Sequence, residues 1–215
     1  MAPVRSAATL VSLVALAAAI GVVAPGCFNE CTDCGGSASD ADTGAADVSG
    51  DGTDATVGGY PAGPYGTGVD EVIENLSFIL PDGETLTLSD LRDRDNARVL
   101  YINTAAGWCT ACREEQPLLR DLHARRADDG LVMMLTYFED SNFNPGTPEG
   151  AGAWRDLYDL EFTVASDGPN VLSNYYDASL APGNIVIELS SMTIVHISTG
   201  ENLDEVEAVA NALLP

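Results

Sequence analysis

Two cysteines, Cys109 and Cys112, follow a tryptophan in the segment Gly-Trp-Cys-Thr-Ala-Cys and are separated by two residues. Cysteines at this spacing can form a redox-active disulfide, supply half of a tetrahedral metal site, or serve as buried structural thiols. A zinc site needs four ligands, and no further Cys or His cluster in the sequence completes such a set at the usual spacings. The residues therefore favour thiol–disulfide chemistry, with two structural thiols as the alternative.

Cys109 lies where a predicted strand ends and a predicted helix begins. The run Ala97–Ala105 is β-branched, aromatic and apolar, as in a buried strand, and the residues after Cys109 have the leucine spacing of a helix that ends near Gly130. A helix N-terminus lowers a thiol pKa from ~8.5 to roughly 3.5–7.5, because unpaired amide hydrogens face the thiolate. We therefore expect Cys109 to be the exposed nucleophile. Cys112, one turn further along, is expected to resolve the mixed disulfide.

The rest of the C-terminal part predicts further strands and helices. Strands are expected at two short stretches within Leu76–Leu91, which flank a turn at Asp82-Gly83, and over 131–138, 162–167, 181–189 and 192–199; helices are expected over 153–160 and 202–214, with a helical turn or two near 170–177. The strand segments are too apolar to have a solvated face, so helices must cover both sides of the sheet. The predicted class is α/β, with a mixed central sheet, helices on both faces, and an N-terminal extension that contains short strands.

The segment Leu100–Leu119 resembles the active-site segment of thioredoxin-fold proteins. It is most similar to the exported TlpA/ResA type within the redoxin, or AhpC/TSA, superfamily. The matching residues are Asn103, Trp108, Cys109, Cys112, Glu115 and Pro117. The resemblance extends from about Leu76 to the C-terminus. It implies a thioredoxin-like fold and a thiol–disulfide oxidoreductase that uses no cofactor and no metal.

The resemblance also implies roles for residues outside the cysteine pair. Glu115 corresponds to a partly buried carboxylate that takes part in proton transfer as the resolving thiol ionises, with a solvated surface glutamate as the alternative. Pro182 corresponds to a cis-proline opposite the cysteines, with an ordinary loop proline as the alternative. Ala181 would then offer its main chain to a bound peptide as an added strand. Trp108, Ala181 and Pro182 are the predicted substrate-binding residues.

Two related redox classes do not fit the residues around the pair. Peroxiredoxins need the pattern Pro-x-x-x-Thr-x-x-Cys, but Ala106 occupies the threonine position and no proline precedes it there. Copper-delivery relatives use Cys-x-x-x-Cys with a distal histidine, and the spacing here is one residue shorter. The two histidines, His123 and His196, receive no catalytic role.

The N-terminal residues predict export and membrane attachment. Arg5 precedes an apolar run from Ala7 to Ala24, whose last residue begins the stretch Ala-Pro-Gly-Cys; these are features of a secretory signal. Residues 1–26 resemble a bacterial lipoprotein signal peptide, with Cys27 as the lipidated first residue of the mature chain. An uncleaved membrane anchor is the alternative. Both place the rest of the chain in the periplasm or the exterior, where nearby cysteines tend to form disulfides.

Residues 27–68 are predicted to be an acidic tether rich in Gly, Ala and Asp, because they contain almost no large apolar side chain. Residues 69–215 would then be the folded domain. Cys31 and Cys34 fall in the tether and lack the strand–helix setting that activates a thiol. The formal net charge is −24, and all nine basic residues are arginines. So acidic a surface repels phosphate backbones and excludes nucleic-acid binding.

These features predict a membrane-tethered, exported thiol–disulfide oxidoreductase. Its expected substrates are disulfides of exported partner proteins, and its expected electron donor is a membrane dithiol. Reduction rather than oxidation is implied by the family resemblance alone. The alternative is a tethered redox-sensing or protein-binding module that keeps the fold without catalytic turnover.

Overall fold

The computed structural model describes residues 56–57, 59–177 and 179–215. The predicted signal peptide, Cys27, the pair Cys31 and Cys34, and the predicted tether as far as residue 55 lie outside the described residues. The described residues lie within one compact unit. In the described part of this unit, no helix has both the length and the apolar character needed to cross a membrane.

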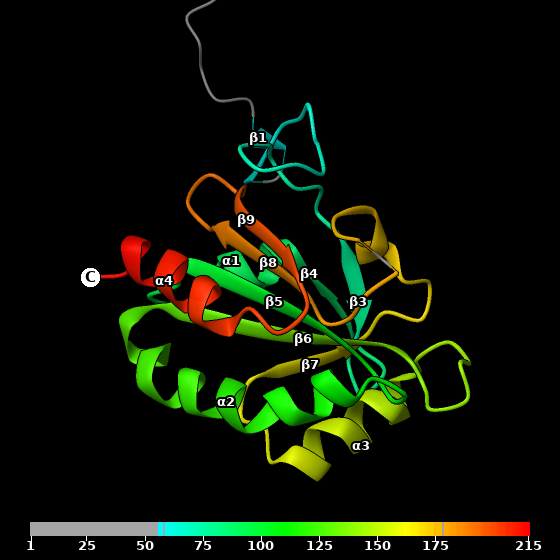
Figure 1. The fold of residues 1–215 in the computed structure, drawn as a ribbon. Coiled ribbons are helices and arrows are strands. Elements are labelled where there is room, and N and C mark those ends of the chain that lie inside the picture. Colours follow the sequence, from blue (N-terminus) through cyan, green and yellow to red (C-terminus); the bar gives the residue numbers. More distant parts are fainter. Residues whose placement is uncertain (1–55, 58, 178) are drawn as a thin grey trace, which may run out of the picture. The chain divides into compact units, whose positions relative to one another are not determined.

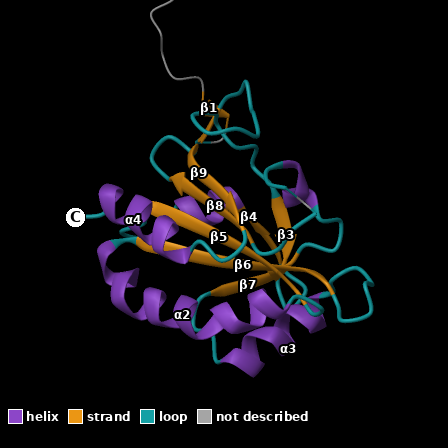
Figure 2. Ribbon diagram, viewed as in Figure 1, coloured by secondary structure: helices purple, strands orange, loops and turns teal. Residues whose placement is uncertain are grey.

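A seven-stranded mixed sheet forms the centre of the unit (Figures 1 and 2). Its strands are β3 Ser77–Ile79, β4 Thr85–Thr87, β5 Val99–Ala106, β6 Leu131–Glu139, β7 Thr163–Ser166, β8 Gly183–Glu188 and β9 Thr193–Thr199. The strand order is β4-β3-β7-β6-β5-β8-β9, in which β5, β6 and β7 are parallel and the remaining pairings are antiparallel. A separate two-stranded sheet pairs β1 (Thr56–Val57) with β2 (Tyr60–Pro61). The predicted mixed sheet is confirmed.

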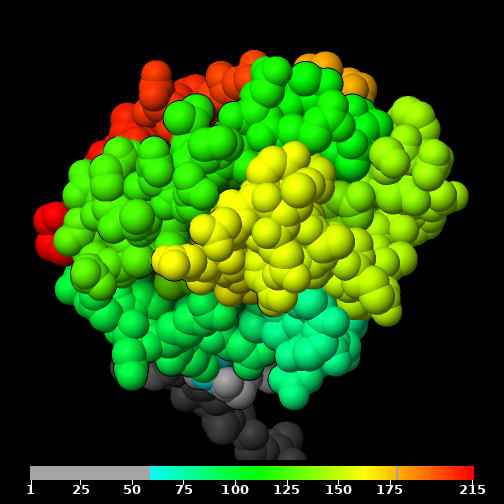
Figure 3. Space-filling view, turned by 90° about the horizontal axis from the view of Figure 1, so that it is seen from below, coloured from blue at the N-terminus to red at the C-terminus, as the bar shows by residue number. Residues whose placement is uncertain are grey.

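Helical segments cover both faces of this sheet, as predicted. They are α1 Leu88–Arg92, α2 Thr110–Arg126, α3 Pro148–Tyr158 and α4 Leu203–Leu213, with short 3-10 turns at Ala127–Asp129 (η1) and Val171–Asn174 (η2). Side chains of α2, α3 and α4 join one buried apolar cluster, whereas those of α1 and η2 join the other. Figure 3 shows the outer surfaces of α2 and α3 next to each other. All eight residues of β5 are buried because both faces are covered.

Helix α3 begins five residues before its predicted start at residue 153. The Thr147 hydroxyl accepts the Gly150 N–H at 3.1 Å, and Pro148 occupies the first helical turn. An N-cap threonine followed by proline is a strong helix start. It outweighs the low helix propensity of the two glycines, Gly150 and Gly152, that made this segment resemble a loop.

The predicted tether over 27–68 is wrong for its last ten residues, 59–68. Tyr60 is 4 % exposed, and its hydroxyl donates to the Ile73 carbonyl oxygen at 3.0 Å. The Arg92 guanidinium lies 5.8 Å from the centre of the Tyr60 ring. One buried aromatic side chain thus anchors this segment to the sheet, although the average composition around it is that of a linker.

Candidate active site

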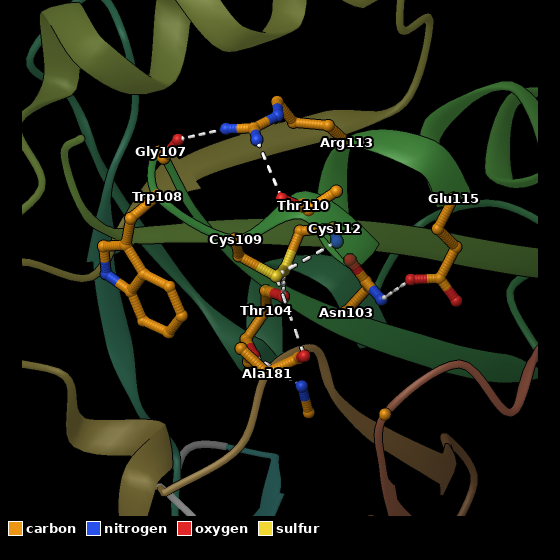
Figure 4. Close-up of a disulfide and its surroundings, with 12 residues drawn as sticks. Asn103, Thr104, Gly107, Trp108, Cys109, Thr110, Cys112, Arg113, Glu115 and Ala181 are labelled. Carbon is orange, nitrogen blue, oxygen red and sulfur yellow. Dashed lines mark hydrogen bonds between the residues drawn. A yellow bond between two sulfur atoms is a disulfide. The ribbon is translucent and has the colours of Figure 1, made fainter.

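A disulfide joins Cys109 and Cys112 at the N-terminal end of α2 (Figure 4). Cys109 is the N-cap residue of this helix, three residues after β5 ends at Ala106, and Cys112 lies in the first turn. The predicted strand-to-helix position is therefore confirmed. The Cys112 amide donates to Cys109 Sγ at 3.0 Å. Once the disulfide is reduced, the same amide and the positive end of the helix stabilise a thiolate on Cys109.

The expected exposure of Cys109 was wrong for this oxidised form. Cys109 is 4 % exposed and Cys112 is fully buried. The Ala181 carbonyl oxygen lies 3.6 Å from Cys109 Sγ and covers the sulfur. Cys109 is still the less buried member of the pair.

The loop between β5 and α2 is fixed from both ends. The Gly107 N–H donates to the Glu139 carbonyl oxygen at 2.8 Å, and a Cβ at this position would lie 2.6 Å from the backbone nitrogen of Ser141. Only glycine allows this close approach. The Arg113 guanidinium donates to the Gly107 carbonyl oxygen at 2.7 Å and to Thr110 Oγ1 at 3.0 Å. These bonds hold the sulfur atoms in a defined position.

Three aromatic side chains lie on one side of the disulfide, and we term them the aromatic flank: Trp108, Phe138 and Phe143. The Trp108 indole donates from Nε1 to the Glu139 carboxylate at 2.8 Å. Its ring stacks on Phe143 with centroids 5.7 Å apart and meets the edge of Phe138 at 6.2 Å. Phe143 is 67 % exposed. The aromatic flank therefore presents apolar surface to solvent next to the cysteines. Phe143, within a segment rich in Asn, Gly and Pro, was not predicted.

The predicted docking turn lies against the cysteine pair. The Ala181–Pro182 peptide bond is cis, as the resemblance implied. The Gly183 N–H donates to Thr104 Oγ1 at 2.8 Å, and the Thr104 carbonyl oxygen lies 3.8 Å from Cys112 Sγ. Thr104 of β5 thus connects the turn with Cys112. Pro182 has no amide hydrogen, so its backbone directs no donor at the sulfurs.

Four buried polar side chains lie on the other side of the disulfide, and we term them the polar cluster: Tyr101, Asn103, Glu115 and Asn184. The Asn103 amide donates to the Glu115 carboxylate at 3.1 Å and to Asn184 Oδ1 at 3.0 Å. The Tyr101 hydroxyl donates to Asn184 Oδ1 at 2.8 Å. Figure 4 shows Glu115 and Trp108 on opposite sides of the two sulfurs. Tyr101 and Asn184 were not predicted, although a polar residue inside the apolar run of β8 is a usable signal.

Glu115 is 3 % exposed, and burial raises its pKa from 4.5 to about 7. The hydrogen bond from Asn103 opposes this rise, and the negative charge of Glu201 adds to it. Its second oxygen, Oε1, has no hydrogen-bond partner in the described part of the chain. Near neutral pH this carboxyl group is therefore balanced between its charged and neutral forms.

No group of three or more His, Cys, Asp and Glu side chains in the described ranges is arranged to hold a metal ion. His123 packs against the Phe162 ring with centroids 5.5 Å apart, and His196 lies within β9. Neither histidine is part of the site.

Comparisons with known proteins agree with this geometry. The sequence profile of the AhpC/TSA family matches residues 72–196. The thiol-disulfide oxidoreductase ResA of Oceanobacillus iheyensis is 25% identical over 134 residues, which cover 62% of this chain and 65% of ResA, slightly under two thirds of that relative. The thioredoxin-like protein YneN of Bacillus subtilis is 28% identical over 123 residues, which cover 55% of this chain and 69% of YneN.

A solved structure shows the same fold. The thioredoxin domain of a thiol-disulfide oxidoreductase from Bacteroides vulgatus superimposes with a TM-score of 0.52 at 15% identity, covering 68% of this chain and 98% of that domain. The predicted thioredoxin-like fold is confirmed. Since the family profile spans more than half of the sequence and includes both cysteines, the chain belongs to the AhpC/TSA family.

Proposed function

We propose that the protein is an exported, membrane-tethered thiol–disulfide oxidoreductase that reduces disulfides of partner proteins. The observation that carries this proposal is the disulfide at the N-terminus of α2, where Cys109 Sγ accepts a helix amide and touches the main chain of Ala181. The name of the relative ResA, a thiol-disulfide oxidoreductase, supports the reaction class.

In the first step, the Cys109 thiolate of the reduced protein attacks one sulfur of the partner disulfide. A mixed disulfide between Cys109 and the partner forms, and the second partner sulfur leaves as a thiolate that takes a proton from water. Ala181 lies beside the reacting sulfur, which supports binding of the partner to its main chain as an extended strand. The aromatic flank provides apolar contact next to this position.

In the second step, Cys112 resolves the mixed disulfide. Cys112 and Glu115 are three residues apart on α2 and therefore share one face of the helix. The Glu115 carboxylate accepts the Cys112 proton, and its pKa of about 7 suits this transfer at neutral pH. The Cys112 thiolate then attacks Cys109 Sγ, the disulfide re-forms, and the partner leaves reduced by two electrons. A membrane dithiol donor restores the Cys109–Cys112 dithiol by the reverse exchange.

The test is turnover of a protein disulfide by the mature chain with a supplied dithiol donor. Between about pH 6 and 8, we expect the chain with the donor to reduce the protein disulfide faster than the donor does alone. This range follows from the pKa values near neutrality that general acid–base catalysis needs. A chain that cycles between dithiol and disulfide but shows no turnover in this range would instead support the redox-sensing or binding module.

Attachment to the membrane through Cys27 is a separate part of the proposal. It is supported by the sequence Ala-Pro-Gly-Cys after an apolar run. Metabolic labelling with a lipid precursor should mark the wild-type chain and not Cys27→Ala. Labelling that survives in this variant would rule out Cys27 as the attachment site.

A further inference from the structure

Tyr176 lies next to the docking turn, which is formed by Ala181 and Pro182, and belongs to the segment that joins β7 to β8. The Tyr176 hydroxyl and Thr104 Oγ1 form a hydrogen bond of 3.2 Å. Thr104 Oγ1 also accepts the Gly183 N–H at 2.8 Å. One hydroxyl oxygen of β5 thus joins Tyr176 to the residue that follows the docking turn. Neither of the proposed exchange steps uses Tyr176.

The ring of Tyr176 packs against the backbone of Gly183 as well. A Cβ atom on Gly183 would lie 2.6 Å from Cγ and Cδ1 of the ring, which is too close for any other residue to fit without movement. Gly183 is therefore restrained twice, by the bond to Thr104 and by the ring. Tyr176 takes part in both contacts.

The segment that carries Tyr176 is fixed at its other end by Asp167. This side chain directly follows β7 and is 2 % exposed. Its carboxylate accepts the N–H groups of Val171 and Leu172 at 2.9 and 3.2 Å. The Tyr175 N–H donates to the Leu172 carbonyl oxygen at 2.9 Å and so continues η2 up to Tyr176. Tyr176 is therefore held by a hydrogen-bonded element, and this allows it to restrain its neighbour.

We propose that Tyr176 is a positioning residue that holds the Ala181 carbonyl oxygen at the place where the main chain of a partner binds. This inference rests on the proposed function and adds to it a residue that sets the preference for extended polypeptides over small disulfides. Ala181 is two residues before Gly183, and its carbonyl oxygen lies 3.6 Å from Cys109 Sγ (Figure 4). A restrained acceptor binds a partner N–H at a smaller entropic cost than a mobile one.

The restraint acts on polypeptide disulfides and not on small ones. An extended polypeptide forms main-chain hydrogen bonds with the docking turn when it adds as a strand. A small disulfide has no main chain, so its reaction depends on the Cys109 thiolate and not on the position of the Ala181 carbonyl group. Loss of the Tyr176 hydroxyl should therefore change the ratio of the two reaction rates.

The test measures the first exchange of the reduced mature chain with two mixed disulfides of thionitrobenzoate. One contains a short extended peptide with a single central cysteine, and the other contains mercaptoethanol. Cys109 attacks the sulfur of the peptide or of mercaptoethanol, a new disulfide forms with Cys109, and thionitrobenzoate leaves as a coloured thiolate. Its release gives the rate of the first exchange before Cys112 acts.

Tyr176→Phe should slow the peptide reaction about three- to tenfold, the size expected for the loss of one neutral hydrogen bond, and leave the mercaptoethanol reaction nearly unchanged. Tyr175→Phe is the matched control. It removes the neighbouring hydroxyl, which faces the Glu74 backbone instead, and should keep the wild-type ratio of the two rates. A general loss of stability would not change this ratio.

The connection through β5 is tested with Thr104→Val, because valine keeps the branched shape and lacks the hydroxyl. This variant should also slow the peptide reaction selectively. Adding Tyr176→Phe to it should lower the ratio little further, since both changes break the same connection. Additive losses would show that the two hydroxyls act separately and would overturn the inference.

An unchanged ratio in Tyr176→Phe would overturn the inference, as would equal slowing of both substrates, because the hydroxyl would then act on the sulfurs and not on the docking turn. The same selective loss in Tyr175→Phe would also contradict it, since loosening of the whole segment would then be the cause. Failure of the proposed function has a different signature: the wild-type chain would react with both substrates no faster than a free dithiol does.

Discussion

The two sides of the Cys109–Cys112 disulfide differ in both polarity and access to solvent. On the side of the aromatic flank, Phe143 is 67 % exposed and stacks on Trp108. On the side of the polar cluster, Glu115 is 3 % exposed and hydrogen-bonded to Asn103. Covering an exposed apolar surface with a partner lowers the free energy of the complex. Burying a carboxyl group raises its pKa toward the value that proton transfer needs.

This difference matches the different tasks proposed for the two sulfurs. Cys109 exchanges with a partner and adjoins the surface that a partner can cover. Cys112 exchanges a proton and lies on the side of Glu115, whose pKa is raised to about 7 by burial. Each task thus has its own environment, although the two cysteines are only three residues apart.

The largest effect is expected when each cysteine is replaced in turn, because the two cysteines have different tasks. Cys112→Ser should accumulate a mixed disulfide through Cys109, because attack proceeds without resolution, whereas Cys109→Ser should form none and reduce no substrate. Mass spectrometry of the chain after incubation with a disulfide substrate distinguishes these outcomes. If Cys109→Ser were the variant that trapped the partner, the assignment of tasks to the two sides would be reversed.

The next effect concerns the polar cluster. Glu115→Gln should slow resolution about a hundredfold near neutral pH, the usual size for loss of a general base, and leave the first attack nearly unchanged. Rapid acid quenching should therefore reveal more transient mixed disulfide than in the wild type. Asp121→Asn, which removes an exposed carboxylate from the same helix, is the control and should resolve normally. Equal resolution rates in all three proteins would remove Glu115 from the mechanism.

Burial of Glu115 should also appear in the pH dependence of stability. The folded oxidised protein keeps the Glu115 proton up to a pKa of about 7, while the unfolded chain loses it near 4.5. The folded state therefore binds more protons between these values, so Glu115 lowers stability as the pH rises through this window. Relative to wild type, Glu115→Gln should gain up to about 3 kcal/mol of unfolding free energy between pH 4 and 8.

Urea unfolding of both oxidised proteins at several pH values measures this difference. Contributions from other titrating groups largely cancel in the comparison. A constant difference across the range would mean that the folded protein does not hold the Glu115 proton.

The smallest effect is expected from the aromatic flank. Phe143→Ala should slow reduction of a protein disulfide about two- to fivefold, because it removes exposed apolar contact but no reacting group. Its unfolding free energy should change by about 0.5 kcal/mol or less, as for other exposed positions. Leu157→Ala on α3 is a matched control, since Leu157 is 72 % exposed. A similar loss of rate in both variants would show that the aromatic flank has no special part in partner binding.

The features that depend on local sequence could be predicted. The buried run of β5, the helix after Cys109 and the turn near Gly83 each follow from periodicity or turn chemistry within a few residues. The junction that carries the cysteine pair therefore follows from the sequence alone. Glu115 and Pro182 needed the family resemblance, because neither has a distinctive local pattern.

The features that depend on distant pairing could not be predicted. Asn103 and Asn184 are 81 residues apart and meet because β5 and β8 pair in one register. Periodicity does not specify which strands are neighbours, so the polar cluster is visible only after folding. The burial of Tyr60 was not predicted for a related reason, since composition does not show that one aromatic ring is buried against Ile73.

One residue at the end of β6 limits how the Gly-Trp-Cys-Thr-Ala-Cys motif could be transferred to another protein. Glu139 accepts the Gly107 amide with its carbonyl oxygen and the Trp108 indole with its carboxylate, each at 2.8 Å. The short segment Gly-Trp-Cys-Thr-Ala-Cys is thus not a self-contained module. An engineer who grafts it onto a new scaffold must also supply an acidic residue on the neighbouring parallel strand, in the register that pairs Ala106 with Glu139.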